Sequence, residues 1–89
     1  MKAKDVLKLI DEAEANIRIA LVSFSTRINE SPYTAFEFTQ TSLELEDLLM
    51  ELSKLREKFK EMDPEEDVDV PEELIAWLKS LINFKAHLF

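Results

Sequence analysis

The complete absence of glycine most restricts the folds open to this chain, since none of its 89 residues is glycine. Glycine supplies the positive φ angles of primed hairpin turns and left-handed helix caps, and it permits close backbone approach to phosphate groups. The chain therefore cannot contain a P-loop or the glycine-rich fingerprint of dinucleotide-binding proteins. Few tight turns are available, which favours long helices over sheets.

A short acidic segment carries the whole net charge. Residues 61–73 read EMDPEEDVDVPEE, with eight acidic residues and no basic one. The chain has 19 acidic and 11 basic residues, so its formal charge of −8 is that of this segment and the remainder is balanced. Pro64 and Pro71 interrupt any continuous helix, and like charges repel one another. We expect a solvated connector here.

Helical periodicity predicts a first long helix over residues 3–29. Its apolar residues recur every three or four positions and share one broad face. Glu14 interrupts that face, whereas Ile19 and Val22 lie away from it. The face comprises Val6, Leu7, Ile10, Ala13, Ile17, Ala20, Leu21, Phe24 and Ile28.

A second long helix is predicted over residues 32–62, because Ser31 followed by Pro32 is a typical helix start. An alternative start lies at Thr41, which has capping-box spacing with Glu44 and would leave 33–40 extended. A third, shorter helix is predicted over 71–87, with Glu72 and Glu73 at its positive end. The second helix has a main apolar face formed by Phe38, Leu45, Leu48, Leu49, Leu52, Leu55 and Phe59.

These elements predict one all-α domain over residues 1–89. Its two long helices pair as an antiparallel αα-hairpin, and the C-terminal helix completes a three-helix bundle. The alternative is an α+β fold with a β-hairpin at about residues 17–41, where β-branched and aromatic residues are frequent.

The second helix carries a further apolar stripe on its opposite side, formed by Phe36, Leu43 and Met50. One interpretation makes this helix central, with both stripes in the core and the third helix as the nearest neighbour for the second stripe. The other leaves an apolar patch open to a protein partner or to a second copy, which favours a homodimer. Both interpretations require that the second helix lies between two neighbours.

We therefore expect a small, non-catalytic interaction protein of the regulator, adaptor, immunity or inhibitor type. An apolar helical patch would bind a protein partner, and the acidic segment would attract a basic one. One alternative is a nucleic-acid mimic that occupies a DNA- or RNA-binding cleft, and another is a helical enzyme using carboxylates and Mg²⁺. The candidate partner-binding residues are Phe36, Leu43, Met50, Trp77, Phe84, Glu65, Glu66, Asp67 and Asp69.

No catalytic, cofactor or metal site is expected. The alternating acids from Asp63 resemble a calcium loop, but Val68 stands where such a loop needs glycine and Leu74 where it needs glutamate. The acids at 44, 46, 47 and 51 lie on the polar side of their helix, and His87 has no nucleophile at a recognisable spacing. Direct nucleic-acid binding is disfavoured by the negative charge, no apolar run is long enough for a membrane span, and the lack of cysteine fits a cytoplasmic protein.

Overall fold

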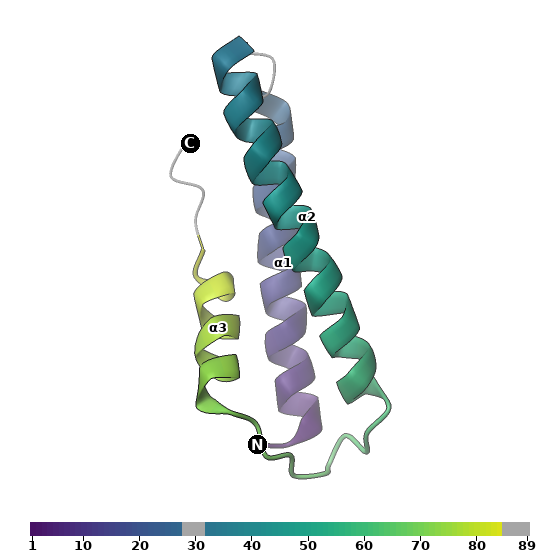
Figure 1. The fold of residues 1–89 in the computed structure, drawn as a ribbon. Coiled ribbons are helices and arrows are strands. Elements are labelled where there is room, and N and C mark those ends of the chain that lie inside the picture. The colour runs from purple at the N-terminus through teal and green to yellow at the C-terminus, as the bar shows by residue number, and fades with distance from the viewer. Residues whose placement is uncertain (28–31, 85–89) are drawn as a thin grey trace.

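The computed structural model describes residues 1–27 and 32–84, with side chains described for 1–23 and 39–84. It contains three helices: α1 (Ala3–Arg27), α2 (Pro32–Lys60) and α3 (Glu72–Ile82) (Figure 1). The all-α class is therefore confirmed. The molecule is elongated, about 50 × 20 × 16 Å, because α1 and α2 form a long antiparallel hairpin.

The alternative β-hairpin at about residues 17–41 is wrong for the described residues. Positions 17–27 belong to α1 and positions 32–41 belong to α2, which runs unbroken through Thr41. The expected alternative start at Thr41 is wrong for the same reason. Helical spacing buries Ile17 and Ala20 together on one side of α1, whereas strand alternation would place only every second residue of this segment on one face.

The core follows the main apolar faces of the two long helices. On α1 the buried residues recur at helical spacing, and on α2 Leu45, Leu52 and Phe59 recur every seven residues. Half-buried Leu48 and Leu55 fill the turns between them. Among the side chains described for α1, those of residues 3–23, the buried ones are Ala3, Val6, Ile10, Ala13, Glu14, Ile17 and Ala20.

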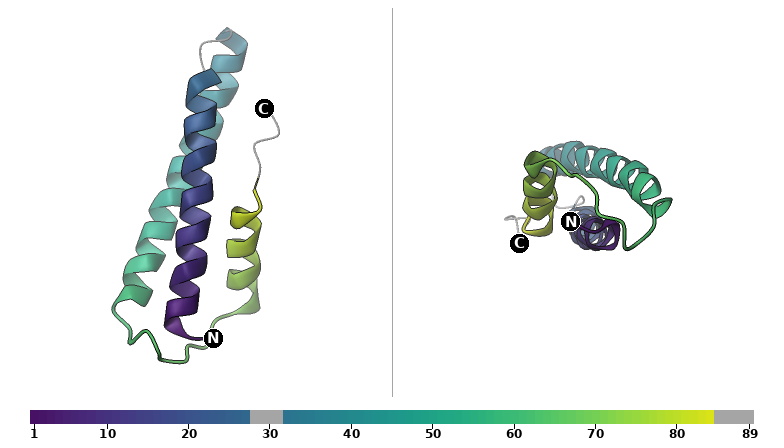
Figure 2. Two further views of the ribbon diagram at one scale, coloured as in Figure 1. Left: turned by 180° about the vertical axis from the view of Figure 1, so that it is seen from behind. Right: turned by 90° about the horizontal axis from the view of Figure 1, so that it is seen from below.

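The central helix is α1, so the interpretation that made α2 central, with α3 as its second neighbour, is wrong. Both α2 and α3 pack on α1, whereas no Cα atom of α2 lies within 8 Å of one in α3 in the described part of the chain. Two views show α3 running parallel to α1 beside its lower half only (Figures 1 and 2). The upper half of the α1–α2 hairpin extends beyond α3.

An amide of α1 meets the chain where α3 ends. The Nδ2 atom of Asn16 donates to the carbonyl oxygens of Leu81 at 2.8 Å and of Phe84 at 2.7 Å. Asn83 donates from its own side chain to the carbonyl of Lys79 at 3.0 Å. These bonds add to the backbone bonds that the same end of α3 makes, from Asn83 N–H to the Lys79 carbonyl and from Phe84 N–H to the Leu81 carbonyl. The helix ends at Ile82, earlier than the expected 87; residues 85–87 lie outside the described ones.

The acidic segment has a fixed backbone beneath the bundle. The first N–H groups of α1 donate to it, from Ala3 to the Glu66 carbonyl at 2.9 Å and from Lys4 to the Pro64 carbonyl at 3.1 Å. Val68 donates in return to the carbonyl of Met1 at 2.8 Å. The connector therefore caps α1 and directs α3 to its side, while its acidic side chains remain exposed.

Candidate interaction surfaces

The predicted partner-binding residues do not form one patch. Leu43 and Met50 lie on α2, whereas Trp77 and Phe84 are half-buried on or just after α3 and pack against the core. The side chain of Phe36 lies outside the described ones. The four predicted acids, Glu65, Glu66, Asp67 and Asp69, are exposed in the connector at the lower end of the molecule.

One exposed apolar surface is the outer side of α2. Leu43 is 52% exposed and Met50 is 60% exposed. Each precedes a buried leucine by two positions, about 200° around the helix, so both point away from α1. Exposed Asp47 and Lys54 lie on the same side of the helix, so the four residues follow one another at intervals of four, three and four positions. We call this set the outer α2 stripe: Leu43, Asp47, Met50 and Lys54.

A second pair of exposed aliphatic residues lies on the outer side of α1. Ile19 is 66% exposed and Val22 is 63% exposed. They follow Ile17 and Ala20 by two positions each, so they too point away from the core. Both belong to the upper half of the hairpin, on the side of α1 turned away from α2, and they do not join the outer α2 stripe into one surface.

The third surface is an open apolar cleft of about 320 Å³ between α2, the connector and α3. Figure 1 shows α1 behind the space that separates the other two helices. We call this cleft the α2–α3 groove. Asp69, Lys58 and Pro71 also line it, and its apolar lining is Leu55, Phe59, Met62, Val68, Val70 and Leu74.

Sequence reasoning missed the groove, although one signal for it was present. Val68 and Val70 are two apolar residues at alternate positions in an otherwise acidic segment. Alternate residues of an extended chain point to the same side. Because Asp67 and Asp69 alternate with the valines, both valines can face the cleft, and Asp69 at its edge stays exposed to water.

One connector acid is neutralised by the N-terminal lysines. Glu65 forms ion pairs with Lys2 at 2.8 Å and Lys4 at 2.7 Å. The hydrogen bonds from Lys2 and Lys4 lower the pKa of the Glu65 carboxyl, and the bond to Glu65 raises the pKa of Lys4. These pairs are exposed, so each contributes little to stability, and Glu65 is less available to a partner than Glu66, Asp67 and Asp69.

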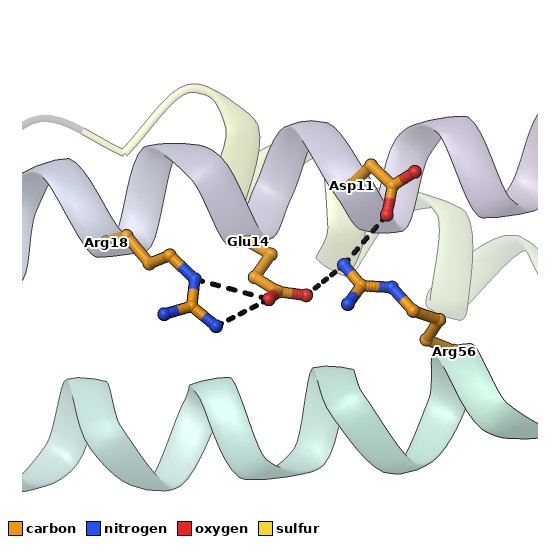
Figure 3. A network of polar contacts seen from close by, with 4 residues as sticks. All are labelled: Asp11, Glu14, Arg18 and Arg56. Atoms are coloured by element: carbon orange, nitrogen blue, oxygen red, sulfur yellow. Dashed lines mark hydrogen bonds and ion pairs between the residues drawn. The ribbon is translucent and has the colours of Figure 1, made fainter.

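The charge inside the apolar face of α1 has a structural role. Glu14, only 7% exposed, accepts from Arg18 Nη2 at 2.8 Å and from Arg56 of α2 (Figure 3). Arg56 also reaches Asp11 at 2.8 Å. Burial pushes the pKa of Glu14 upward, but the hydrogen bonds and charges of both arginines outweigh it and hold the pKa below its ordinary value. This network ties α1 to α2.

The described residues offer little else that resembles a site. They contain no group of three or more His, Cys, Asp or Glu side chains placed to hold a metal ion. The acids at 44, 46, 47 and 51 are exposed on α2. No helix within the described ranges is both long and apolar enough to cross a membrane.

Comparisons with known proteins add no assignment. No protein-family model, no curated protein and no solved structure matches this chain at a significant level.

Proposed function

We propose that this protein is a small, acidic, non-catalytic protein-interaction module of the regulator, adaptor, immunity or inhibitor type. It associates with a second copy of itself through the outer α2 stripe, and its acidic connector attracts a basic protein partner. One observation carries this proposal. The stripe exposes two large aliphatic side chains on a helix whose opposite side is already packed on α1.

The charges of the stripe favour a second copy as its occupant. Asp47 and Lys54 flank Met50, three positions before it and four positions after it. An antiparallel two-fold arrangement centred between Met50 and Glu51 places Asp47 of each copy opposite Lys54 of the other. The two Met50 side chains then lie beside each other at the axis, and Leu43 lies opposite Lys58 of the other copy. One surface is complementary to itself, as a two-fold interface requires.

The stripe is narrow, so we expect a weak dimer. Stable interfaces bury at least about 1,200 Å² in total. Two large aliphatic side chains on each copy supply only part of that area, which predicts dissociation in roughly the micromolar range. The connector lies at the lower end of the molecule and remains open to another protein in such a dimer.

Sedimentation equilibrium tests the self-association. Met50→Glu places a carboxylate in the apolar contact at the axis, and we expect at least a tenfold weaker dimer for this variant. Because the Met50 side chain is 60% exposed, helicity and thermal stability should change little. The matched control is Ala76→Glu, which adds the same charge on the exposed side of α3 and should leave the dimer unchanged.

Two results would contradict this proposal. One is a wild-type protein that stays monomeric up to millimolar concentration. The other is a dimer that Ala76→Glu weakens as much as Met50→Glu does, because the effect would then be one of total charge.

A further inference from the structure

We propose that the α2–α3 groove binds a short amphipathic helix from a partner protein, with basic residues flanking the apolar side of that helix. This rests on the proposed interaction function, but it uses a surface separate from the outer α2 stripe. The partner that the acidic connector attracts is then a protein with a basic amphipathic helix.

The groove offers an apolar surface of the kind that helices dock into. Phe59, at its base, is 6% exposed, and the other apolar lining side chains are half-buried. Leu55 and Phe59 come from successive turns of α2, and Met62 lies two residues beyond the end of that helix. Leu74 comes from the first turn of α3, and Trp77 follows it by three positions on the same side of that helix. A docked side chain can therefore contact apolar groups from both walls.

The arrangement of the three helices favours a helical occupant. Both α2 and α3 pack on α1 but not on each other. They occupy three positions of a four-helix arrangement, in which each helix contacts two neighbours. A helix laid between α2 and α3 takes the fourth position. The 11 residues of α3 span about 16 Å, so the matching helix has roughly three turns.

The charges around the groove favour a partner helix that has basic residues on either side of its apolar face. Asp69 lines the groove, and the connector that forms its lower wall belongs to the segment with eight acidic residues and no basic one. Within the described residues, Glu65 is the connector acid that Lys2 and Lys4 engage, which leaves the exposed carboxylates of Glu66, Asp67 and Asp69 for a partner. Lys58 is the basic residue of the lining.

A synthetic peptide tests the proposal directly. The probe is a fluorescent amphipathic peptide of about 14 residues, which has leucines at helical spacing and lysines on both flanks. The matched peptide carries glutamate at every lysine position. Fluorescence anisotropy should show saturable binding of the basic peptide, at least tenfold tighter than that of the acidic one. The affinity should fall as salt rises from 50 to 300 mM, because exposed charges are screened.

Paired variants separate groove binding from general attraction to an acidic protein. Met62→Glu and Leu43→Glu both add one negative charge, but only the first changes the groove. We expect Met62→Glu to weaken peptide binding at least tenfold, although the added carboxylate makes the protein more negative than the wild type. We expect Leu43→Glu to keep the wild-type affinity for the peptide within twofold. If circular dichroism shows that Met62→Glu is unfolded, Met62→Ala replaces it, with a loss of about fivefold expected.

The proposal is overturned if a folded Met62 variant binds the basic peptide as well as Leu43→Glu does. It is equally overturned if the basic and acidic peptides bind alike, or if NMR shift changes on binding are confined to the connector carboxylates and spare Leu55, Phe59 and Leu74. Sedimentation of the wild-type protein reports separately on the proposed self-association, so the two failures are distinguishable.

Discussion

At the scale of single residues, Glu14 shows what the sequence indicates and what it leaves open. Helical spacing places this carboxylate inside the apolar face of α1, which signals that it needs a partner. Arg18, one turn along the same helix, is a foreseeable partner. Arg56 is not a foreseeable partner, because it is 42 positions away in the sequence and comes close to Glu14 only when the two helices pair. The register of the hairpin supplies the missing information.

Replacing Glu14 by glutamine should destabilise the protein by about 2 kcal/mol. Breaking a fully buried ion pair costs roughly 3–5 kcal/mol, but Arg56 is partly exposed and keeps Asp11, which reduces the loss. Urea denaturation measures the change, and Asp11→Asn, at an exposed position, is the control with an effect below about 1 kcal/mol. Equal stability of Glu14→Gln and the wild type would show that the network does not tie α1 to α2.

Glu14 also predicts a dependence of stability on pH. Its pKa in the folded protein lies below the ordinary value of 4.5, so folding favours the ionised carboxyl. The stabilisation is fully present above about pH 4.5 and is lost as the pH falls through the lower folded value. Urea denaturation between pH 7 and pH 3 should show wild-type stability decreasing below pH 4.5 more steeply than that of Glu14→Gln. Parallel curves would exclude Glu14 as the source.

At the scale of helices, the sequence predicts which sides are apolar but not which neighbour covers each side. The all-α hairpin follows from helical spacing, as the buried Ile10, Ile17 and Leu52 illustrate. The placement of α3 does not follow from the sequence pattern, because the apolar side of α3 could pack on α1 or on α2 equally well. The connector decides it through backbone hydrogen bonds to Ala3 and Lys4, which no side-chain pattern encodes.

The contact between α1 and α3 should depend on Asn16. Replacing Asn16 by alanine removes two hydrogen bonds to the chain at the end of α3, each worth about 0.5–1.5 kcal/mol. Hydrogen exchange should then show faster opening of α3 amides, while those in the lower halves of α1 and α2 keep their protection. The exposed Asn83→Ala is the milder control, and uniform acceleration in all three helices would contradict a local role for Asn16.

At the scale of the whole molecule, the candidate site could be predicted only in part. Leu43 and Met50 were identifiable because their spacing opposes the main face of α2. The α2–α3 groove was not identifiable from the sequence, since it exists only because α1 is central and holds the other two helices apart. Trp77 and the connector acids, which were predicted as partner-binding residues together with Leu43, lie on other elements, on α3 and at the lower end.

In the proposed dimer, α2 packs on α1 with one side and on a second copy with the other. Sedimentation equilibrium of charge-reversed variants tests it most directly. Asp47→Lys alone and Lys54→Asp alone should each weaken the dimer about tenfold, because like charges then face one another. The double variant should restore wild-type dissociation, since each lysine at position 47 again meets an aspartate at position 54 of the other copy. A double variant as weak as the single ones, or single variants that dimerise normally, would contradict the account.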